Sequence, residues 1–192
     1  MLKHVITTVL VAVLLSFSTA ALGSPIGLPW GKKVDKHFKK VEDLRYIYGS
    51  VAQGEIIYHG RIGGVETEIQ VTFTDEYVSR VITILGPSGL NLFNCQSSYN
   101  KIVNLLNKKY GHFVFKKLKE SSEITDLIYS NRCRPLMLGM REVTAYWKTK
   151  NLRITATLWG DEENIYIELE YIYTPLANKL KRSKAKKLLN KL

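Results

Sequence analysis

The pattern of apolar and polar positions changes its period along the chain. Between residues 32 and 45, apolar residues recur every three or four positions among lysines, which predicts a short amphipathic helix. From Glu55 the period becomes two, and residues 65–74 alternate as in a strand with one buried and one solvated face. Runs at 55–61 and 77–85 flank this strand across short connections that suit hairpins. The first half therefore predicts a helix followed by a three-stranded antiparallel meander.

The same order of elements recurs in the second half. A second amphipathic helix is predicted from 94 to about 110, because its apolar positions share one side and Gly111 follows its end. Irregular strands are expected near 112–118 and 123–129, and three alternating strands follow at 143–147, 152–158 and 165–173. The sequence thus predicts an α+β fold in which two helix-plus-meander halves, 32–85 and 94–173, form a helix-on-sheet sandwich. The halves share no residue-level identity, so only their shape suggests an internal duplication.

The strict alternation assigns each strand residue to one of two faces. Seven apolar residues are predicted to lie in the core: Ile69, Val71, Phe73, Ile154, Leu158, Ile167 and Leu169. Five charged residues are predicted to meet solvent or a partner: Glu66, Glu68, Arg153, Glu168 and Glu170. A shift of register by one residue would exchange the two sets.

The N-terminal residues 1–23 have the pattern of a signal peptide. An apolar run from Val5 to Leu15 follows a short polar start, and small residues come next, so cleavage is expected after Ala20, Ala21 or Gly23. The alternative is an uncleaved anchor, since the apolar stretch is just long enough to span a bilayer. Interspersed Thr and Ser residues favour cleavage. We therefore expect a periplasmic or secreted protein with a single folded domain over 24–175.

Two cysteines, Cys95 and Cys133, are the only ones in the chain. In an exported protein they predict a disulfide, which closes a long loop and stabilises the fold by about 4 kcal/mol in the chain-entropy model. The alternatives are two buried free thiols, or a reactive thiol at the start of the second helix. The scattered histidines offer no ligand spacing for zinc, and we expect neither a metal nor another cofactor.

Basic residues are concentrated at the C-terminal end. The chain has 28 Lys and Arg residues against 17 Asp and Glu, a net charge of +11. Residues 176–192, the basic tail, hold seven basic residues and no acidic one: Lys179, Lys181, Arg182, Lys184, Lys186, Lys187 and Lys191. The tail predicts an amphipathic helix that adheres to an anionic membrane surface or envelope polymer. Nucleic acid is the weaker target, because no stacking aromatic residues are interleaved. The alternative is a helix docked on the body, or a frayed solubilising tail.

No motif of a catalytic site is present. Ser88 follows Gly86-Pro87, which lacks the spacing of a nucleophile elbow, and the chain has neither a phosphate-binding loop nor a His-Glu-x-x-His sequence. The pairs Glu66/Glu68 and Glu168/Glu170 could serve acid–base catalysis, but alternation on a solvated strand face explains them equally. An enzyme whose site is assembled in space stays an alternative.

Several short sequences resemble those of small exported bacterial proteins: Leu28-Pro29-Trp30-Gly31, Tyr110-Gly111, Trp147 and Leu169-Glu170-Tyr171. The order of elements is also similar to β-lactamase-inhibitor-like and outer-membrane assembly lipoprotein-like modules, although the chain lacks the acylated cysteine of such lipoproteins. The resemblance implies an envelope binding module and transfers no catalytic residue. The sequence thus favours an exported, non-enzymatic binding or envelope-associated protein. The alternatives are an inhibitor-like or immunity-like partner of another secreted protein, and an exported enzyme with a site on the polar sheet face.

Overall fold

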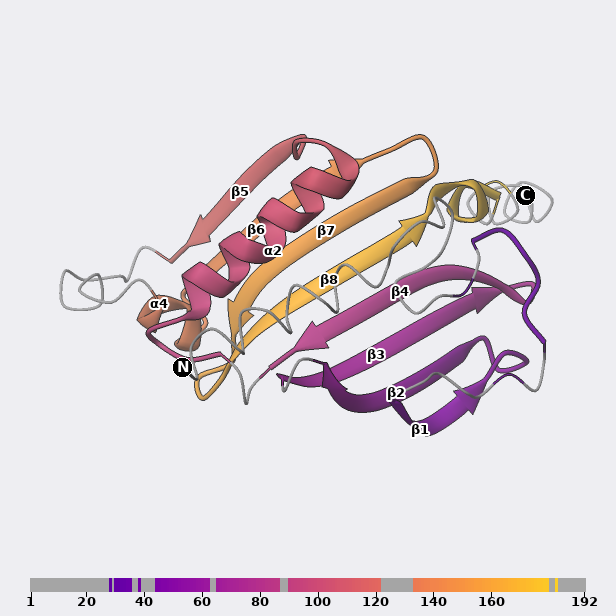
Figure 1. Cartoon of the computed structure of the whole chain (residues 1–192), viewed down its shortest axis with the longest axis horizontal. Helices are drawn as coiled ribbons and strands as arrows, with labels where there is room; N and C mark the ends of the chain where they lie inside the picture. The colour runs from indigo at the N-terminus through magenta and orange to yellow at the C-terminus, as the bar shows by residue number, and fades with distance from the viewer. Residues whose placement is uncertain are drawn as a thin grey trace, which may run out of the picture.

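A single eight-stranded antiparallel sheet dominates the fold (Figure 1). The computed structural model describes residues 28, 30–35, 38, 44–62, 65–86, 90–121, 133–179 and 182. The strands are β1 (Leu44–Ser50), β2 (Glu55–Ile62), β3 (Val65–Thr74), β4 (Tyr77–Leu85), β5 (Phe115–Glu120), β6 (Arg141–Lys148), β7 (Leu152–Gly160) and β8 (Ile165–Tyr173). Among the described residues they are accompanied by the helix α2 (Cys95–Tyr110) and the single turn α4 (Arg134–Met137), and the chain is helical again at 174–179. The predicted α+β class is confirmed, with the sheet as its main component.

The strand order is β1-β2-β3-β4-β8-β7-β6-β5, so the sheet consists of two four-stranded meanders. Their last strands, β4 and β8, pair antiparallel in the middle of the sheet. Each meander therefore runs inward from an outer edge, and the two edges of the sheet are β1 and β5. Six strands were predicted from period-two alternation, and all six are present. They are β2, β3 and β4 of the first meander and β6, β7 and β8 of the second.

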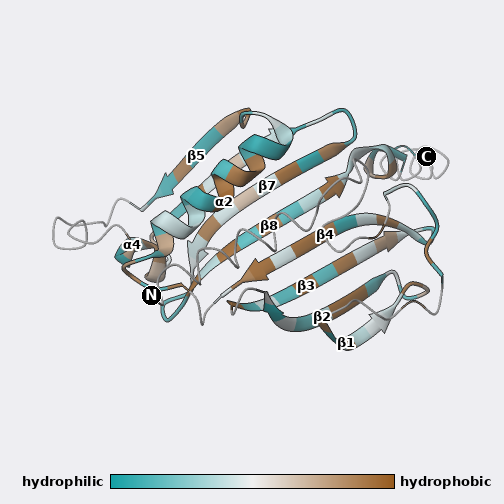
Figure 2. Ribbon diagram, in the orientation of Figure 1, coloured by the Kyte–Doolittle hydropathy of each residue, from teal (hydrophilic) through white to brown (hydrophobic). Residues whose placement is uncertain are grey.

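The predicted register is confirmed as well. All seven residues predicted as core are buried, and cross-strand partners such as Val71, Val81 and Tyr171 continue the buried face from strand to strand. The five predicted charged residues lie on the opposite face and are exposed or half-buried. Figure 2 shows the resulting alternation of hydrophobic and hydrophilic bands along the strands. Burial of one face fixed the register, because a one-residue shift would put the charged set inside.

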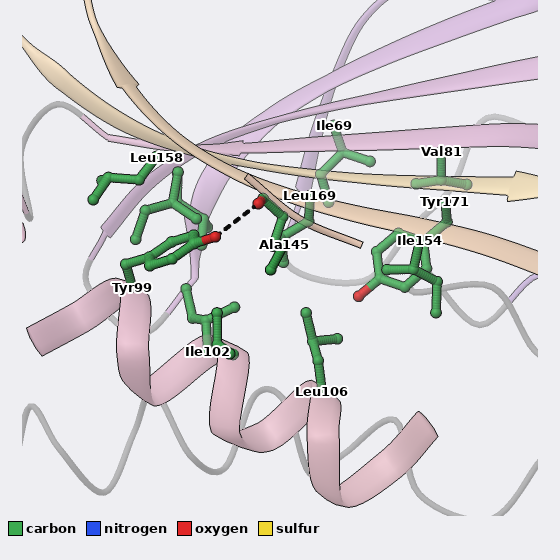
Figure 3. Close-up of a cluster of buried hydrophobic side chains, with 14 of the residues drawn as sticks. Ile69, Val81, Tyr99, Ile102, Leu106, Ala145, Ile154, Leu158, Leu169 and Tyr171 are labelled. Atoms are coloured by element: carbon green, nitrogen blue, oxygen red, sulfur yellow. Dashed lines mark hydrogen bonds between the residues drawn. The ribbon is translucent and has the colours of Figure 1, made fainter. Parts of the chain in front are cut away.

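Helix α2 packs on the buried face of the sheet, over β6 and β7. Its stripe of Tyr99, Ile102 and Leu106 points at the sheet residues, as Figure 3 shows. The buried Tyr99 hydroxyl donates a hydrogen bond to the backbone oxygen of Ala156 at 3.0 Å. The end of the helix is fixed too, because Asn107 accepts a hydrogen bond from the indole nitrogen of Trp147 at 3.0 Å.

The helix predicted for residues 32–45 is wrong where the structure describes that range. Residues 32–35 and 38 are not helical, and Leu44 begins β1. Lys33 instead forms a β-bridge with Tyr77, and Val34 is buried in the core as part of an irregular entry segment. Val34 and the partly buried Phe38 pack against the core, so these two described residues are covered without belonging to a helix. Residues 36, 37 and 39–43 lie outside the described residues.

Some of the other predicted segments lie wholly or partly outside the described residues. The strand near 112–118 is β5, shifted toward the C-terminus, whereas the strand near 123–129 and the signal segment 1–23 lie outside the described residues. The chain turns helical at 174–179, where the basic tail begins. Within the part that the structure describes, no helix is long and apolar enough to cross a membrane.

Candidate binding surface

The face of the sheet opposite α2 is its second, polar face, which we call the open face. Cross-strand pairing defines it: Gln70, Ile82, Glu170, Thr155 and Tyr146 lie side by side across β3, β4, β8, β7 and β6. In the first meander the open face carries the buried residues Ile57 and Ile82. In the second meander every open-face residue of β5, β6, β7 and β8 is exposed or half-buried. This half of the face is accessible to a partner.

Two stacked aromatic pairs lie on the accessible half. Phe115 of β5 stacks on Tyr146 of β6 with ring centroids 4.9 Å apart, and Phe115 is 49% exposed. Trp159 of β7 stacks on Tyr166 of β8 with centroids 4.6 Å apart. Trp159 also holds an indole N–H that is shielded from solvent and has no hydrogen-bond partner among the described residues. Both pairs are cross-strand contacts, so the sheet ladder holds the rings in place.

Two threonines fill the space between the aromatic pairs. Thr144 and Thr157 are cross-strand neighbours with hydroxyl oxygens 3.5 Å apart, and Thr144 donates a hydrogen bond to the Glu142 carboxylate at 3.1 Å. The aromatic pairs are offset by roughly 13 Å along the strands, the length of four strand residues, and by two strand spacings, roughly 10 Å, across the sheet. We call the six residues the aromatic patch: Phe115, Thr144, Tyr146, Thr157, Trp159 and Tyr166.

Charged residues of both signs surround the aromatic patch. Glu170 accepts a hydrogen bond from Arg80 Nε at 2.6 Å and forms an ion pair with this arginine. The neighbouring Glu168 has a raised pKa, chiefly because burial disfavours its charged form and further because of the charges of Glu170 and Glu142. Arg80 opposes this rise only in part. The exposed cations Lys117 and Arg153 balance these carboxylates on the same face.

The titratable groups of the open face do not converge on one point. His59 Nε2 lies 2.7 Å from Glu68, and Gln70 donates to Glu55 at 2.6 Å, so these groups of the first meander pair with each other. His59 is three strands away from Glu168, or about 14 Å at the usual strand spacing. Among the described residues no group of three His, Cys, Asp or Glu side chains could hold a metal ion.

A cavity of about 240 Å³ lies at one end of β5, β6 and β7, lined by residues 119–121, 139–142, 159 and 160. Two of its four charged lining residues, Glu120 and Arg141, form an ion pair with each other, and the other two are Lys119 and Glu142. Gly160 is closely covered by α4, since a Cβ atom there would come within 2.3 Å of the Leu136 oxygen.

The sequence-predicted site residues fall into two groups. Cys95 and Cys133 lie at disulfide distance, with Cα atoms 6.1 Å apart, at the starts of α2 and α4. Of the basic tail, Lys179 is exposed and lies 3.2 Å from Asp75, and Arg182 is exposed. The other five basic residues of the tail lie outside the described residues: Lys181, Lys184, Lys186, Lys187 and Lys191.

The aromatic patch is the feature that sequence reasoning missed. A signal was present, because Tyr146 precedes the core residue Trp147, and Trp159 follows the core residue Leu158, so alternation places both on the open face. The stacking itself could not be predicted, because it depends on which residue of the neighbouring strand lies opposite each ring. The order and register of the strands determine that partner. Comparisons with protein-family models, curated proteins and solved structures found no match to this chain.

Proposed function

We propose that the protein is an exported, non-enzymatic binding protein of the cell envelope that engages a partner protein through the aromatic patch. The observation that carries this proposal is the pair of cross-strand aromatic stacks on an accessible sheet half. Aromatic side chains are enriched in protein interfaces, because they contribute large contact areas and lose little side-chain entropy.

The surroundings of the patch support a protein partner over a polyanion. Both signs of charge lie around the rings, with Lys117, Lys119 and Arg153 against Glu142, Glu168 and Glu170. A surface for a polyanion would be predominantly basic, whereas a polar rim of mixed charge is typical of protein interfaces.

The spread of the titratable groups supports binding over catalysis. Acid–base catalysis needs groups within hydrogen-bond reach of one reacting atom, and His59 and Glu168 are far too distant for that. A binding face needs no such convergence, only a rigid and complementary surface. An inhibitor-like or immunity-like protein is one form of this function, in which the partner is another secreted protein.

The proposal is tested by capture from an envelope extract with matched variants. Tyr146→Ala removes one ring of the aromatic patch, and Phe93→Ala removes an aromatic ring that is 91% exposed just before α2, away from the open face. We expect Tyr146→Ala to lose most of the partner that the wild-type protein captures and Phe93→Ala to retain it. Equal capture by both variants would reject the aromatic patch as the binding surface.

A further inference from the structure

We propose that the free edge of β5 accepts an extended acidic segment of a partner protein as a ninth strand. The proposal rests on the proposed function only in that the partner is a protein, and it concerns the strand edge beside the aromatic patch. β5 is the last strand of the sheet and pairs with β6 alone among the described strands. Addition of a strand at such an edge is a common form of peptide recognition.

The hydrogen-bond ladder shows which backbone groups of β5 are available. Ser121 donates its N–H to Met140 at 2.8 Å, and the pairing of Lys119 with Glu142 and of Lys117 with Thr144 continues this register. In an antiparallel pair, residues that exchange hydrogen bonds alternate with residues that do not. The backbone groups of Lys117 and Lys119 therefore face β6, and those of Lys116, Leu118 and Glu120 point to the free edge.

The β6–β7 ladder leads to the same assignment. Thr149 donates its N–H to the Leu152 oxygen at 2.8 Å, which places the backbone groups of Trp147, Ala145 and Val143 toward β7. The even-numbered residues of β6 therefore face β5, in agreement with the first ladder. Two independent observations thus assign the free groups of the edge.

Among the described residues no further strand pairs with this edge, and the pairing of β5 with β6 has no register shift. All six residues of β5 are exposed, and Leu118 is 54% exposed although it is apolar. The other edge is less suited to a new strand, because a bulge interrupts the pairing of β1 with β2 between Tyr46 and Tyr48. Gly49, just after this bulge, has a positive φ of 98°, which takes the backbone out of the strand conformation.

The charge of β5 selects an acidic occupant. Lys116, Lys117 and Lys119 form no ion pair with another described residue, whereas the one acid, Glu120, is held by Arg141. Lys117 and Lys119 lie on the open face, and Lys116 lies on the α2 side, where its Nζ is 5.9 Å from the Tyr99 ring. Edge lysines repel basic strands and discourage uncharged ones, but they attract carboxylates on an added strand. The best occupant has acidic residues opposite Lys117 and Lys119 and an apolar residue opposite Leu118.

The probe for this proposal is a labelled heptapeptide in which Glu alternates with Val, titrated against the purified full-length protein by fluorescence anisotropy at low salt. A second peptide has the same sequence but carries N-methyl groups at alternate backbone nitrogens, so it keeps the charge and loses the strand ladder. A third peptide has Lys in place of Glu. We expect saturable binding of the first peptide, binding at least about tenfold weaker for the N-methylated one, and none for the Lys peptide.

The protein variant Leu118→Pro tests the same edge. Its N–H points away from β6, so proline removes a donor to the new strand and leaves the β5–β6 ladder intact. We expect weaker peptide binding and an unchanged thermal melting curve. If the variant fails to fold, the comparison of the two Glu peptides decides the matter alone.

Equal affinity of the plain and N-methylated Glu peptides would overturn the proposal, because lysine charge alone would then explain binding. Absence of saturable binding of the plain peptide would overturn it as well. Either result leaves the proposed function standing if Tyr146→Ala still abolishes envelope capture. The opposite outcome is also possible: the Glu peptide binds, but Tyr146→Ala captures as much partner as the wild-type protein. This result would reject the aromatic patch as the binding surface and support strand addition at β5.

Discussion

Neighbouring residues of β8 lie on opposite faces of the sheet, one in the core and the other on the polar surface. Leu169 is 3% exposed and belongs to the core beneath α2, whereas its neighbour Glu168 is half-buried on the open face beside Glu170. Burial and like charge raise the pKa of Glu168 above its ordinary value. The core face of β8 therefore stabilises the fold, whereas the ionised Glu168 on its other face lowers the free energy of unfolding.

Truncation of each neighbour separates these two roles. Leu169→Ala should lower the free energy of unfolding by roughly 2–5 kcal/mol, because it leaves a cavity in a packed core. Glu168→Ala should change it by about 0.5 kcal/mol or less. Chemical denaturation of the two variants measures both values, and similar losses would mean that the two residues do not face opposite sides.

The pH dependence of Glu168 has a definite sign. A carboxyl group whose pKa is raised on folding favours the folded state most when it is protonated, so ionisation weakens the fold as pH rises above the unfolded-state pKa. Glu168→Gln should therefore raise the melting temperature at pH 7 by about 1–3 °C, and the gain should vanish near pH 3. Glu163→Gln, in the exposed loop before β8, is the matched control and should change neither value. A gain that persists unchanged at pH 3 would contradict this explanation.

At the scale of elements, the sequence predicted strands with strict alternation and failed where alternation was absent. β3, β7 and β8 bury every second residue, so their period was visible in the sequence alone. β1 is an edge strand with a bulge and consecutive apolar residues at Tyr46, Ile47 and Tyr48, so it has no clear period and was overlooked. The pairing of β4 with β8 was equally hidden, because contacts between distant segments leave no local pattern.

The Cys95–Cys133 pair links the start of α2 to the start of α4. We predict that the pair is oxidised, so thiol labelling of unfolded, unreduced protein should detect no free cysteine. The variant with both cysteines changed to alanine should be less stable by about 2–4 kcal/mol, because the unfolded chain regains the entropy of the open loop. Two labelled thiols per unreduced chain would show that the pair is not bonded.

At the scale of the whole molecule, the protein has a nearly balanced open face and a basic C-terminal tail. The chain is helical over 174–179, and Lys179 in this segment makes an exposed contact with Asp75. Such surface ion pairs contribute little to stability. We propose that the body and the tail act separately, the body on a protein partner and the tail on an anionic surface.

Removal of the tail tests this division. A chain that ends at Thr174 should lose most of its affinity for anionic vesicles, while its melting temperature stays nearly unchanged. Raising salt from about 0.05 to 0.5 M should weaken vesicle binding by the intact protein, because the Debye length falls from roughly 14 to 4 Å. A lower melting temperature together with salt-independent behaviour would identify the tail as part of the core instead.

The central claim is that a partner binds the open face at the aromatic patch. Site-specific photo-crosslinking in living cells tests it most directly, with a benzophenone amino acid placed at Thr144, between the two aromatic pairs, or at Asn104, on the exposed side of α2. We predict one dominant protein adduct from position 144 and none from position 104. An adduct at position 104 alone, or equal adducts at both positions, would contradict the account.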